Sequence, residues 1–502
     1  MRTPSCTEPV QLIGPWRNAT EGAAAVLCAV VAMAAVTALA LALLDADSYG
    51  SLGSLTMTVT AMAVGGSVSA DPGVSGSTGG MGGLASLFGG GGGMQPSMSG
   101  AADAVPLGVT LVGAVVLWIV FSWRVRHRKQ RRFTSGELAV RAAGAGIAAL
   151  LTFMIVAGFA HGPATMPASV MAGIRGSGSD QTAGGLGSGG GLGGLLGGGG
   201  GLGGLLGGGG GLGGLLGGGG GTGAPSVMTY HVGVGAAGFG ALLWTAVVIG
   251  VGCLISRQVR LPLGGALDGL RAIWGPSLSV VVRTLLVLAV VPLLAIGFVG
   301  AVVGDQAGTV AGAVLLLAPN ALAVFLTLGV GSSWTAAVHP VQSDSSNPLA
   351  AIMGDMRGSG GGQQIARTEQ LGTLSAGGWP LWLAAFIVSG LILLACAYRA
   401  ARATHPSHKQ SVFRDRGRLA GHLGMAERVG VVTAVVLGAG AWLVGASGHF
   451  GVSMFGSQMG GMQAELSGNV LRTVAFGLFV GGLAGFAGSL LSEVRGDRGL
   501  TE

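Results

Sequence analysis

The sequence predicts an all-α, polytopic integral membrane helix bundle, with about eight full spans plus a broken or re-entrant segment and glycine-rich, disordered outer loops. Half of the 502 residues are apolar and only 9% are charged, whereas about a quarter of an ordinary soluble domain is charged. Several uncharged stretches are long enough to cross a hydrocarbon core of roughly 30 Å as a helix. This composition excludes a soluble globular protein.

Nine apolar stretches have the length of a spanning helix. They are residues 22–44, 105–123, 142–160, 232–256, 278–303, 309–330, 379–398, 429–447 and 470–491. The first stretch is longer than the core of a signal peptide, so we expect it to be an uncleaved span. The alternative is cleavage near Ala38 to Ala40.

The positively charged residues predict the orientation of these spans. Most of the 26 lysines and arginines lie at 124–141, at 257–283 and at 399–428. Positive residues in short loops are held on the cytoplasmic side, which predicts a plasma-membrane protein with both termini in the cytoplasm. We expect the lipid bilayer as a partner, with anionic headgroups at the basic inner loops. Nucleic acid is not expected, because the basic runs lack interleaved aromatic residues.

The predicted organisation follows from these spans and loops. In order, it comprises a cytoplasmic head (1–21), three spans with an outer and a basic inner loop (22–160), a glycine-rich outer loop (161–231), central spans (232–398), a basic cytoplasmic loop (399–428), two last spans (429–491) and a cytoplasmic tail (492–502).

One of the central segments cannot cross the membrane, because three crossings would not return the chain to the same side. The segment 309–330 is the best candidate, since Pro319 and Asn320 lie at its centre. Proline removes a helix hydrogen bond and asparagine adds a polar group. We expect a re-entrant or broken helix there, shielded by other helices or water. The alternative is a kinked full span beside a wrongly assigned neighbour.

The predicted outer loops contain repeats. Residues 171–181 resemble 353–363, and residues 86–100 resemble 453–468, which suggests four modules with an outer glycine- and methionine-rich loop each. The alternative is chance similarity, because glycine-rich sequence aligns with itself easily. A decapeptide of glycine and leucine also occurs three times between Gly191 and Gly220. Glycine loses much entropy on ordering, so we expect these decapeptides to form a flexible linker.

Motifs for enzyme chemistry are missing from the sequence. No phosphate-binding loop, zinc-protease motif, nucleophile elbow or dinucleotide fingerprint occurs in a plausible context, and no catalytic or cofactor-binding residue is predicted. The four cysteines, at positions 6, 28, 253 and 396, all fall outside the predicted outer loops, so no exported disulfide framework is expected.

The outer loops are rich in methionine and histidine, which are soft ligands suited to copper(I). The most compact set is His449, Met454, Met459 and Met462, which a short loop could gather at small entropic cost. A copper site here is a minor hypothesis, because methionine also fills gaps in loose packing. The alternative is that Phe450, Met454 and Phe455 rest on the lipid interface.

The chain resembles the streptophobe family, a group of very apolar actinobacterial multi-pass membrane proteins. The resemblance rests on Leu43 to Ser48, Gly50 to Gly53, Ala63 to Ser67, Pro106 to Val109 and the pair Pro319 and Asn320. It implies a plasma-membrane location. The family has no established activity, so the resemblance implies no catalytic residue.

Two classes of function remain open at this stage. The first is a non-enzymatic envelope or accessory membrane component, favoured because charged groups are scarce in the predicted spans. The second is a permease or channel gated at the helix break at Pro319 and Asn320, because interrupted helices often line a substrate path.

Overall fold

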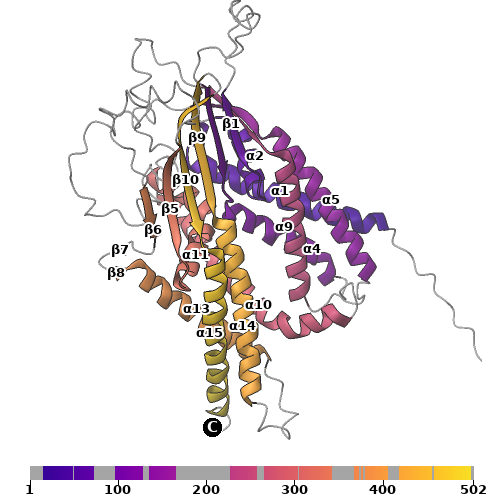
Figure 1. Ribbon diagram of the computed structural model, residues 1–502. Coiled ribbons are helices and arrows are strands. Elements are labelled where there is room, and N and C mark those ends of the chain that lie inside the picture. The colour runs from indigo at the N-terminus through magenta and orange to yellow at the C-terminus, as the bar shows by residue number, and fades with distance from the viewer. Residues whose placement is uncertain are drawn as a thin grey trace, which may run out of the picture.

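The computed structural model is mostly helical and adds a sheet that the sequence did not predict (Figure 1). It describes residues 15–48, 50–72, 97–127, 135–165, 227–256, 265–303, 305–341, 367–371, 375–376, 379–404, 418–454 and 457–498. The glycine and leucine decapeptides, residues 171–181 and 353–363, and most of the basic connections lie outside these ranges.

The long helices account for all nine predicted segments. They are α1 (Pro15–Leu43), α4 (Leu107–His127), α5 (Ser135–Phe159), α9 (Val234–Ile255), α10 (Gly265–Val303), α11 (Asp305–Gly329), α13 (Leu381–Thr404), α14 (Arg418–Val444) and α15 (Val470–Arg498). A shorter helix α2 (Leu52–Met62) and a 3-10 turn η1 (Ala46–Ser48) follow α1. Seven of the described helices are long and apolar enough to cross a membrane, which fits a membrane-embedded protein.

Several helices begin earlier than predicted: α5 begins at Ser135 and not at residue 142, and α10 begins at Gly265 and not at residue 278. Helix α14 begins at Arg418, inside the segment expected to be a basic loop. Helix α11 is continuous from Asp305 to Gly329 with Pro319 inside it. The helix break expected at Pro319 and Asn320 is therefore wrong, and the physical reason is that α4 pairs with the polar groups at this point, as described below.

The prediction of an all-α fold with disordered outer loops is wrong where those loops begin and end. Each predicted outer connection contains a pair of strands: β1 (Val68–Pro72) and β2 (Ser97–Asp103), β3 (His161–Thr165) and β4 (Val227–Val232), β5 (Trp334–Val341) and β6 (Arg367–Gln370), β9 (Ala446–Met454) and β10 (Ser457–Gly468). These strands form one antiparallel sheet in the order β3-β4-β1-β2-β9-β10-β5-β6. The short strands β7 (Ser375–Ala376) and β8 (Trp379–Pro380) pair separately.

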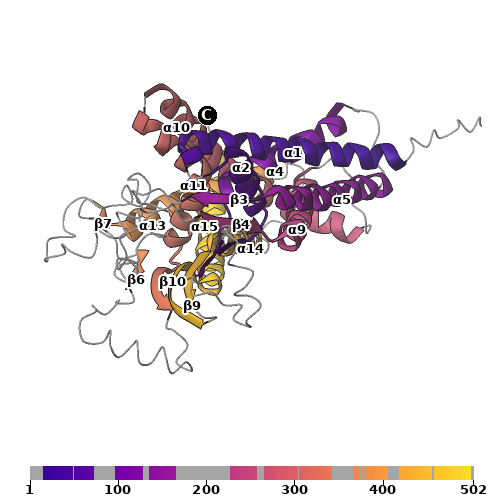
Figure 2. The same ribbon diagram turned by 90° about the horizontal axis from the view of Figure 1, so that it is seen from above.

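The sheet lies at one end of the helices. In Figure 1 the strands β9 and β10 stand above α14 and α15, which run side by side down to the C-terminus. Helices α1 and α5 also lie side by side and extend away from the strands, as Figure 2 shows from above. All four connections that the charge pattern assigned to the outer side therefore meet in a single layer.

The chain repeats one succession of elements. Apart from η1 in the first unit and the pair β7-β8 in the second, the first unit, residues 15–255, runs α1-α2-β1-β2-α4-α5-β3-β4-α9, and the second, residues 265–498, runs α10-α11-β5-β6-α13-α14-β9-β10-α15. In the sheet, β3-β4-β1-β2 of the first unit is followed by β9-β10-β5-β6 of the second. The units meet where β2 pairs with β9 over seven residue pairs, from Ser97 opposite Ser453 to Asp103 opposite Ser447.

Details of the backbone confirm that α2 and α11 are counterparts. Each ends at a glycine with positive φ, Gly65 at 95° and Gly331 at 100°. The amide of Gly65 donates to the carbonyl of Met62, and that of Gly331 donates to Leu328, both over 2.9 Å. The next amides along the chain, those of Gly66 and Ser332, donate to the carbonyls of Ala61 and Thr327, both over 3.0 Å. This pattern is a Schellman C-cap, in which glycine accepts the left-handed conformation at little cost.

The strands after these caps also match in register. Val68 lies opposite Val232 in the first unit, and Trp334 lies opposite Gly468 in the second. The carbonyl of Ser67 accepts the amide of Gly233 at the start of α9, as that of Ser333 accepts the amide of Asn469 before α15. The structural repeat thus relates the first outer connection to the third, whereas the sequence comparison had paired the first with the fourth.

Candidate functional site

The structure places Pro319 and Asn320 where α11 crosses the start of α4. The side-chain oxygen of Asn320 accepts the backbone N–H of Leu107 over 2.8 Å, and its amide nitrogen donates to the carbonyl of Val105 over 2.7 Å. The first amides of a helix have no partner within the helix. Asn320 therefore caps α4 from a distant part of the chain, and its polar group does not need a helix break or water.

The proline one residue earlier explains how closely the two helices approach. Pro319 has no N–H, so the carbonyl of Leu315 lacks its usual partner four residues on. Gly108 of α4 backs onto this carbonyl, and a side chain at position 108 would collide with it. Helix α4 is also joined to the end of α2, because the hydroxyl of Thr110 donates to the carbonyl of Ala63 over 2.7 Å.

Helix α11 contacts other helices near the ends that face the sheet. Gly312 packs against Ala40 near the end of α1, and Gly329 packs against Ala385 near the start of α13. Just beyond α11, the hydroxyl of Ser332 lies 2.6 Å from that of Thr473, near the start of α15. Near the end of α11, Leu326 also shares a buried cluster with Leu437 of α14, against which Leu285 of α10 and Ile392 of α13 pack. Helix α11 therefore contacts the sheet-side ends of α1, α4 and α13 and also reaches the middle of α10 and α13.

Two buried basic residues lie at the opposite ends of the helices, away from the sheet. The first is Arg141, within the first two turns of α5, with only 4% of its side chain exposed. Its guanidinium lies 3.7 Å from the carboxylate of Glu21 on α1 and 4.7 Å from the ring centre of Phe121 on α4. A charge this buried needs a partner of opposite sign, and the ion pair and the aromatic ring together bind α1, α4 and α5 at this end.

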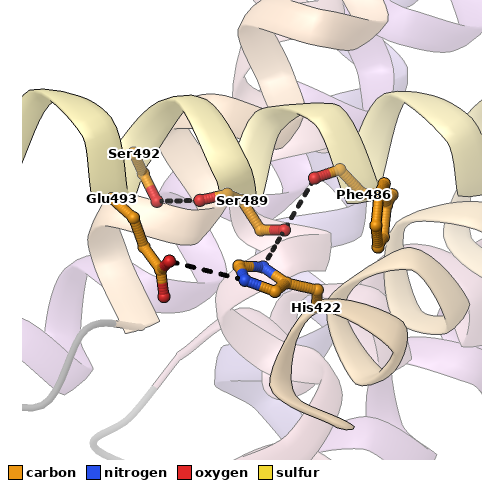
Figure 3. A network of polar contacts seen from close by, with 5 residues as sticks. All are labelled: His422, Phe486, Ser489, Ser492 and Glu493. Carbon is orange, nitrogen blue, oxygen red and sulfur yellow. Dashed lines mark hydrogen bonds and ion pairs between the residues drawn. The ribbon is translucent and has the colours of Figure 1, made fainter. Parts of the chain in front are cut away.

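The second is His422, within the first two turns of α14, the counterpart of α5 in the second unit. Its Nδ1 lies 2.7 Å from the hydroxyl of Ser489, and its Nε2 lies 3.5 Å from the carboxylate of Glu493. Figure 3 shows the imidazole beside α15, with both side chains directed at it and the ring of Phe486 next to it.

The His422 cluster has two consistent hydrogen-bond arrangements. A neutral imidazole accepts from Ser489 at Nδ1 and directs its Nε2–H to Glu493. A protonated imidazole directs both N–H groups outward, and Ser489 then donates to the carbonyl of Phe486, which lies 2.7 Å away. Ser489 is only 7% exposed, so the cluster is built as a contact between α14 and α15 and not as an accessible nucleophile.

The predicted copper ligands lie on the β9-β10 hairpin instead of a loop. His449 is opposite Gln463, and Met462 is opposite Phe450. Neighbouring residues of a strand point to opposite faces of the sheet, so His449 and Met462 leave the hairpin on opposite faces. Met454 pairs with Ser457 next to the turn, and Met459 lies at an irregularity between Gln458 and Gly460. Among the described residues, no group of three or more histidine, cysteine, aspartate or glutamate side chains could hold a metal ion.

Sequence reasoning missed both buried basic clusters. Arg141 and His422 stand near several arginines in the sequence and were read as part of, or next to, cytoplasmic basic loops. The available signal was their place in the helical period, because Leu138 and Met425, a turn away from each on the same helix, are also buried. Glu493 gave no comparable signal, since it lies near the polar C-terminal end of its helix.

Comparison with known proteins adds no relative. No protein-family model, curated protein or solved structure matches this chain. The resemblance to the streptophobe family therefore rests on the sequence motifs alone and stays a prediction.

Proposed function

We propose that this chain is a non-enzymatic, multi-pass component of the plasma membrane that supports a rigid sheet on the outer side. The observation that carries this proposal is the pairing of β2 with β9, which joins the two units into one continuous sheet. Seven antiparallel residue pairs fix the sheet-side ends of both units relative to each other.

The orientation follows from charge and from the sheet together. The strands gather all four connections that carry few positive residues, and the basic connections leave the helices at their other ends. The positive-inside rule then puts the sheet outside and both termini in the cytoplasm. The basic connections would contact anionic headgroups of the inner leaflet.

Eight full spans agree with this orientation. We assign them to α1, α4, α5, α9, α10, α13, α14 and α15, and we propose that α11 enters from the outer side without crossing. Helix α11 has the length and composition of a span. Its contacts with Ala40, Leu107 and Ala385 lie at the sheet side, and Leu326 near its end reaches the cluster that includes Leu285 and Ile392. If α11 does not cross, the basic segments before α10 and after α13 both lie on the cytoplasmic side, as the positive-inside rule requires.

A static scaffold fits this arrangement better than a permease whose halves rock against each other. Repeat units of transporters move relative to one another around a central site, whereas the sheet of this protein continues from one unit into the next. The permease hypothesis also relied on a broken helix, and α11 is continuous with its polar Asn320 engaged by α4.

Cysteine accessibility tests the orientation. Single cysteines at Ser177, Ser359 and Ser457 should react with an impermeant thiol reagent in intact cells, and a cysteine at Ser407 should react only after permeabilisation. Labelling of Ser407 without labelling of Ser359 would contradict the proposal.

Reconstitution in liposomes tests the class of function. The proposal predicts no flux across a panel of ions, sugars and amino acids. Protein-dependent flux that disappears in Asn320→Leu would instead establish a permease that uses the contact between α11 and α4.

A further inference from the structure

One face of the eight-stranded sheet carries all four histidines of its strands, and these histidines lie in a single row. Residues directly opposite each other on neighbouring strands share a face. All four histidines are exposed. In the order of the strands, the row consists of His161 on β3, His231 on β4, Ser69 on β1, Ala101 on β2, His449 on β9, Gln463 on β10 and His339 on β5.

Among the described strands, one pair of these histidines occupies neighbouring positions. His161 and His231 are directly opposite each other, which places their Cβ atoms about 4.5–5.5 Å apart. Strand β10 separates His449 from His339, and the strands β1 and β2 separate His231 from His449. The pair of His161 and His231 is therefore the place on this face where two imidazoles can share one ligand.

The contacts of each ring indicate which nitrogen has the lone pair. Nδ1 of His161 lies 2.8 Å from the carbonyl oxygen of Gly158. Because a carbonyl only accepts, this nitrogen carries the proton and Nε2 has the lone pair. Nδ1 of His231 lies 3.4 Å from the carboxylate of Asp71, which favours a proton on that nitrogen, and the hydroxyl of Ser69 then donates to Nε2 over 2.9 Å. In both neutral imidazoles, Nε2 is the free acceptor nitrogen of the ring.

We propose that Nε2 of His161 and Nε2 of His231 together bind one divalent transition-metal ion of the class of Cu²⁺ and Zn²⁺. Imidazole is a common ligand of these ions. A histidine that ligates a metal usually donates its other N–H to a carboxylate or a backbone carbonyl, and Asp71 and Gly158 provide these two acceptors. The ion takes the place of the Ser69 hydroxyl at Nε2 of His231, and water molecules complete its coordination.

The site has two protein ligands and an open side. Asp71 orients His231 through Nδ1 and is not a ligand, which agrees with the finding that no group of three or more histidine, cysteine, aspartate or glutamate side chains in the described structure could hold a metal ion. The side chain of His231 is 51% exposed, so an ion can approach it from solvent together with its water ligands.

The charges of the sheet also favour a cation on this face. The seven strands that form the histidine row contain no lysine or arginine. Their three acidic residues are Asp71, Asp103 and Glu465, and each lies two residues along its strand from the histidine row. Side chains two residues apart on a strand point to the same face. A divalent cation therefore meets carboxylates and no positive side chain from these strands.

Titration with Cu²⁺ against a competing chelator, followed by electron paramagnetic resonance, tests the site in untagged, detergent-solubilised full-length protein. The native protein should bind Cu²⁺ through two imidazole nitrogens. His161→Ala and His231→Ala should each lower the affinity by about tenfold or more and leave fewer than two nitrogens in the spectrum. Asp71→Asn should lower the affinity by about tenfold and keep both nitrogens, because it changes only the partner of Nδ1.

The other two histidines of the row supply matched controls. His449→Ala and His339→Ala each remove an exposed imidazole from the same face, but neither residue is opposite a histidine, so both variants should bind Cu²⁺ as the native protein does. Unfolding temperatures measured without metal establish that all variants fold. An unchanged affinity in His161→Ala, an equal loss in the pair variants and the controls, or a single coordinating nitrogen in the native protein would overturn the proposal.

Discussion

The side chain of Asn320 closes the start of α4 by accepting the amide of Leu107 and donating to the carbonyl of Val105, two residues more than two hundred positions earlier. This contact joins the second unit to the first at the level of the sheet. It also gives hydrogen-bond partners to the side-chain amide of Asn320, which lies in the middle of the apolar helix α11.

Replacing Asn320 tests this joint. Asn320→Leu should lower the free energy of unfolding by about 2–3 kcal/mol, because it leaves an amide and a carbonyl without partners at a half-buried site. Asn320→Asp keeps the acceptor and loses the donor. Its free energy of unfolding should therefore lie between that of the native protein and that of Asn320→Leu. Chemical denaturation in mixed micelles gives the comparison, and a Leu variant as stable as the native protein would show that water replaces Asn320 there.

The two C-cap glycines should respond alike. Gly65→Ala and Gly331→Ala should each cost about 1–2 kcal/mol, because an L residue is strained in the left-handed conformation. Gly53, inside α2, has open space around its Cα and serves as the control, since alanine at a helix interior is favourable. A loss at only one of the two caps would argue against equivalent roles in the two units.

The ion pair between Glu21 and Arg141 should contribute far more to stability than the exposed pair between Arg17 and Glu21. Glu21→Gln takes the carboxylate away from a buried guanidinium and should cost about 3 kcal/mol. Arg17 also lies 3.8 Å from Glu21, but its side chain is 60% exposed, so Arg17→Gln should cost less than about 1 kcal/mol. Equal losses in the two variants, measured by unfolding in detergent, would contradict this ranking.

The hairpin register makes a prediction for the copper hypothesis. A site that uses His449 and Met462 together would require the strands to separate, because these side chains leave opposite faces. Titration with copper(I) against a competing chelator should therefore give the same affinity for the native protein and for Met459→Leu, Met462→Leu. A clear loss of affinity in the double variant would restore the four-residue site.

The helices could be predicted from the sequence because apolar length alone defines them. All nine segments overlap long helices, whereas the argument that one central segment does not cross stays a prediction. The sheet could not be predicted in the same way. Strands such as Ser97–Asp103 consist mainly of serine, glycine and alanine, which have weak β-propensity, and they are ordered by pairing with strands from distant connections.

The polar contacts escaped prediction for a related reason. The partner of Asn320 is the backbone of α4, which has no side-chain signature, and the partner of Arg141 lies on a helix far away in the chain. Local composition reports which residues are apolar, whereas these contacts depend on which helices meet.

Disulfide trapping across the seam between the two units tests the central claim most directly. Ala101 on β2 lies opposite His449 on β9, and the adjacent residue Gly448 lies opposite Ala102. In a cysteine-free background, Ala101→Cys with His449→Cys should form a disulfide when an impermeant oxidant is added to intact cells, because both side chains share one face of an outer sheet. The pair Ala101→Cys with Gly448→Cys should not, since its side chains point to opposite faces. Equal yields from the two pairs, or a disulfide at 101 and 449 only after the cells are permeabilised, would contradict a single sheet on the outer side.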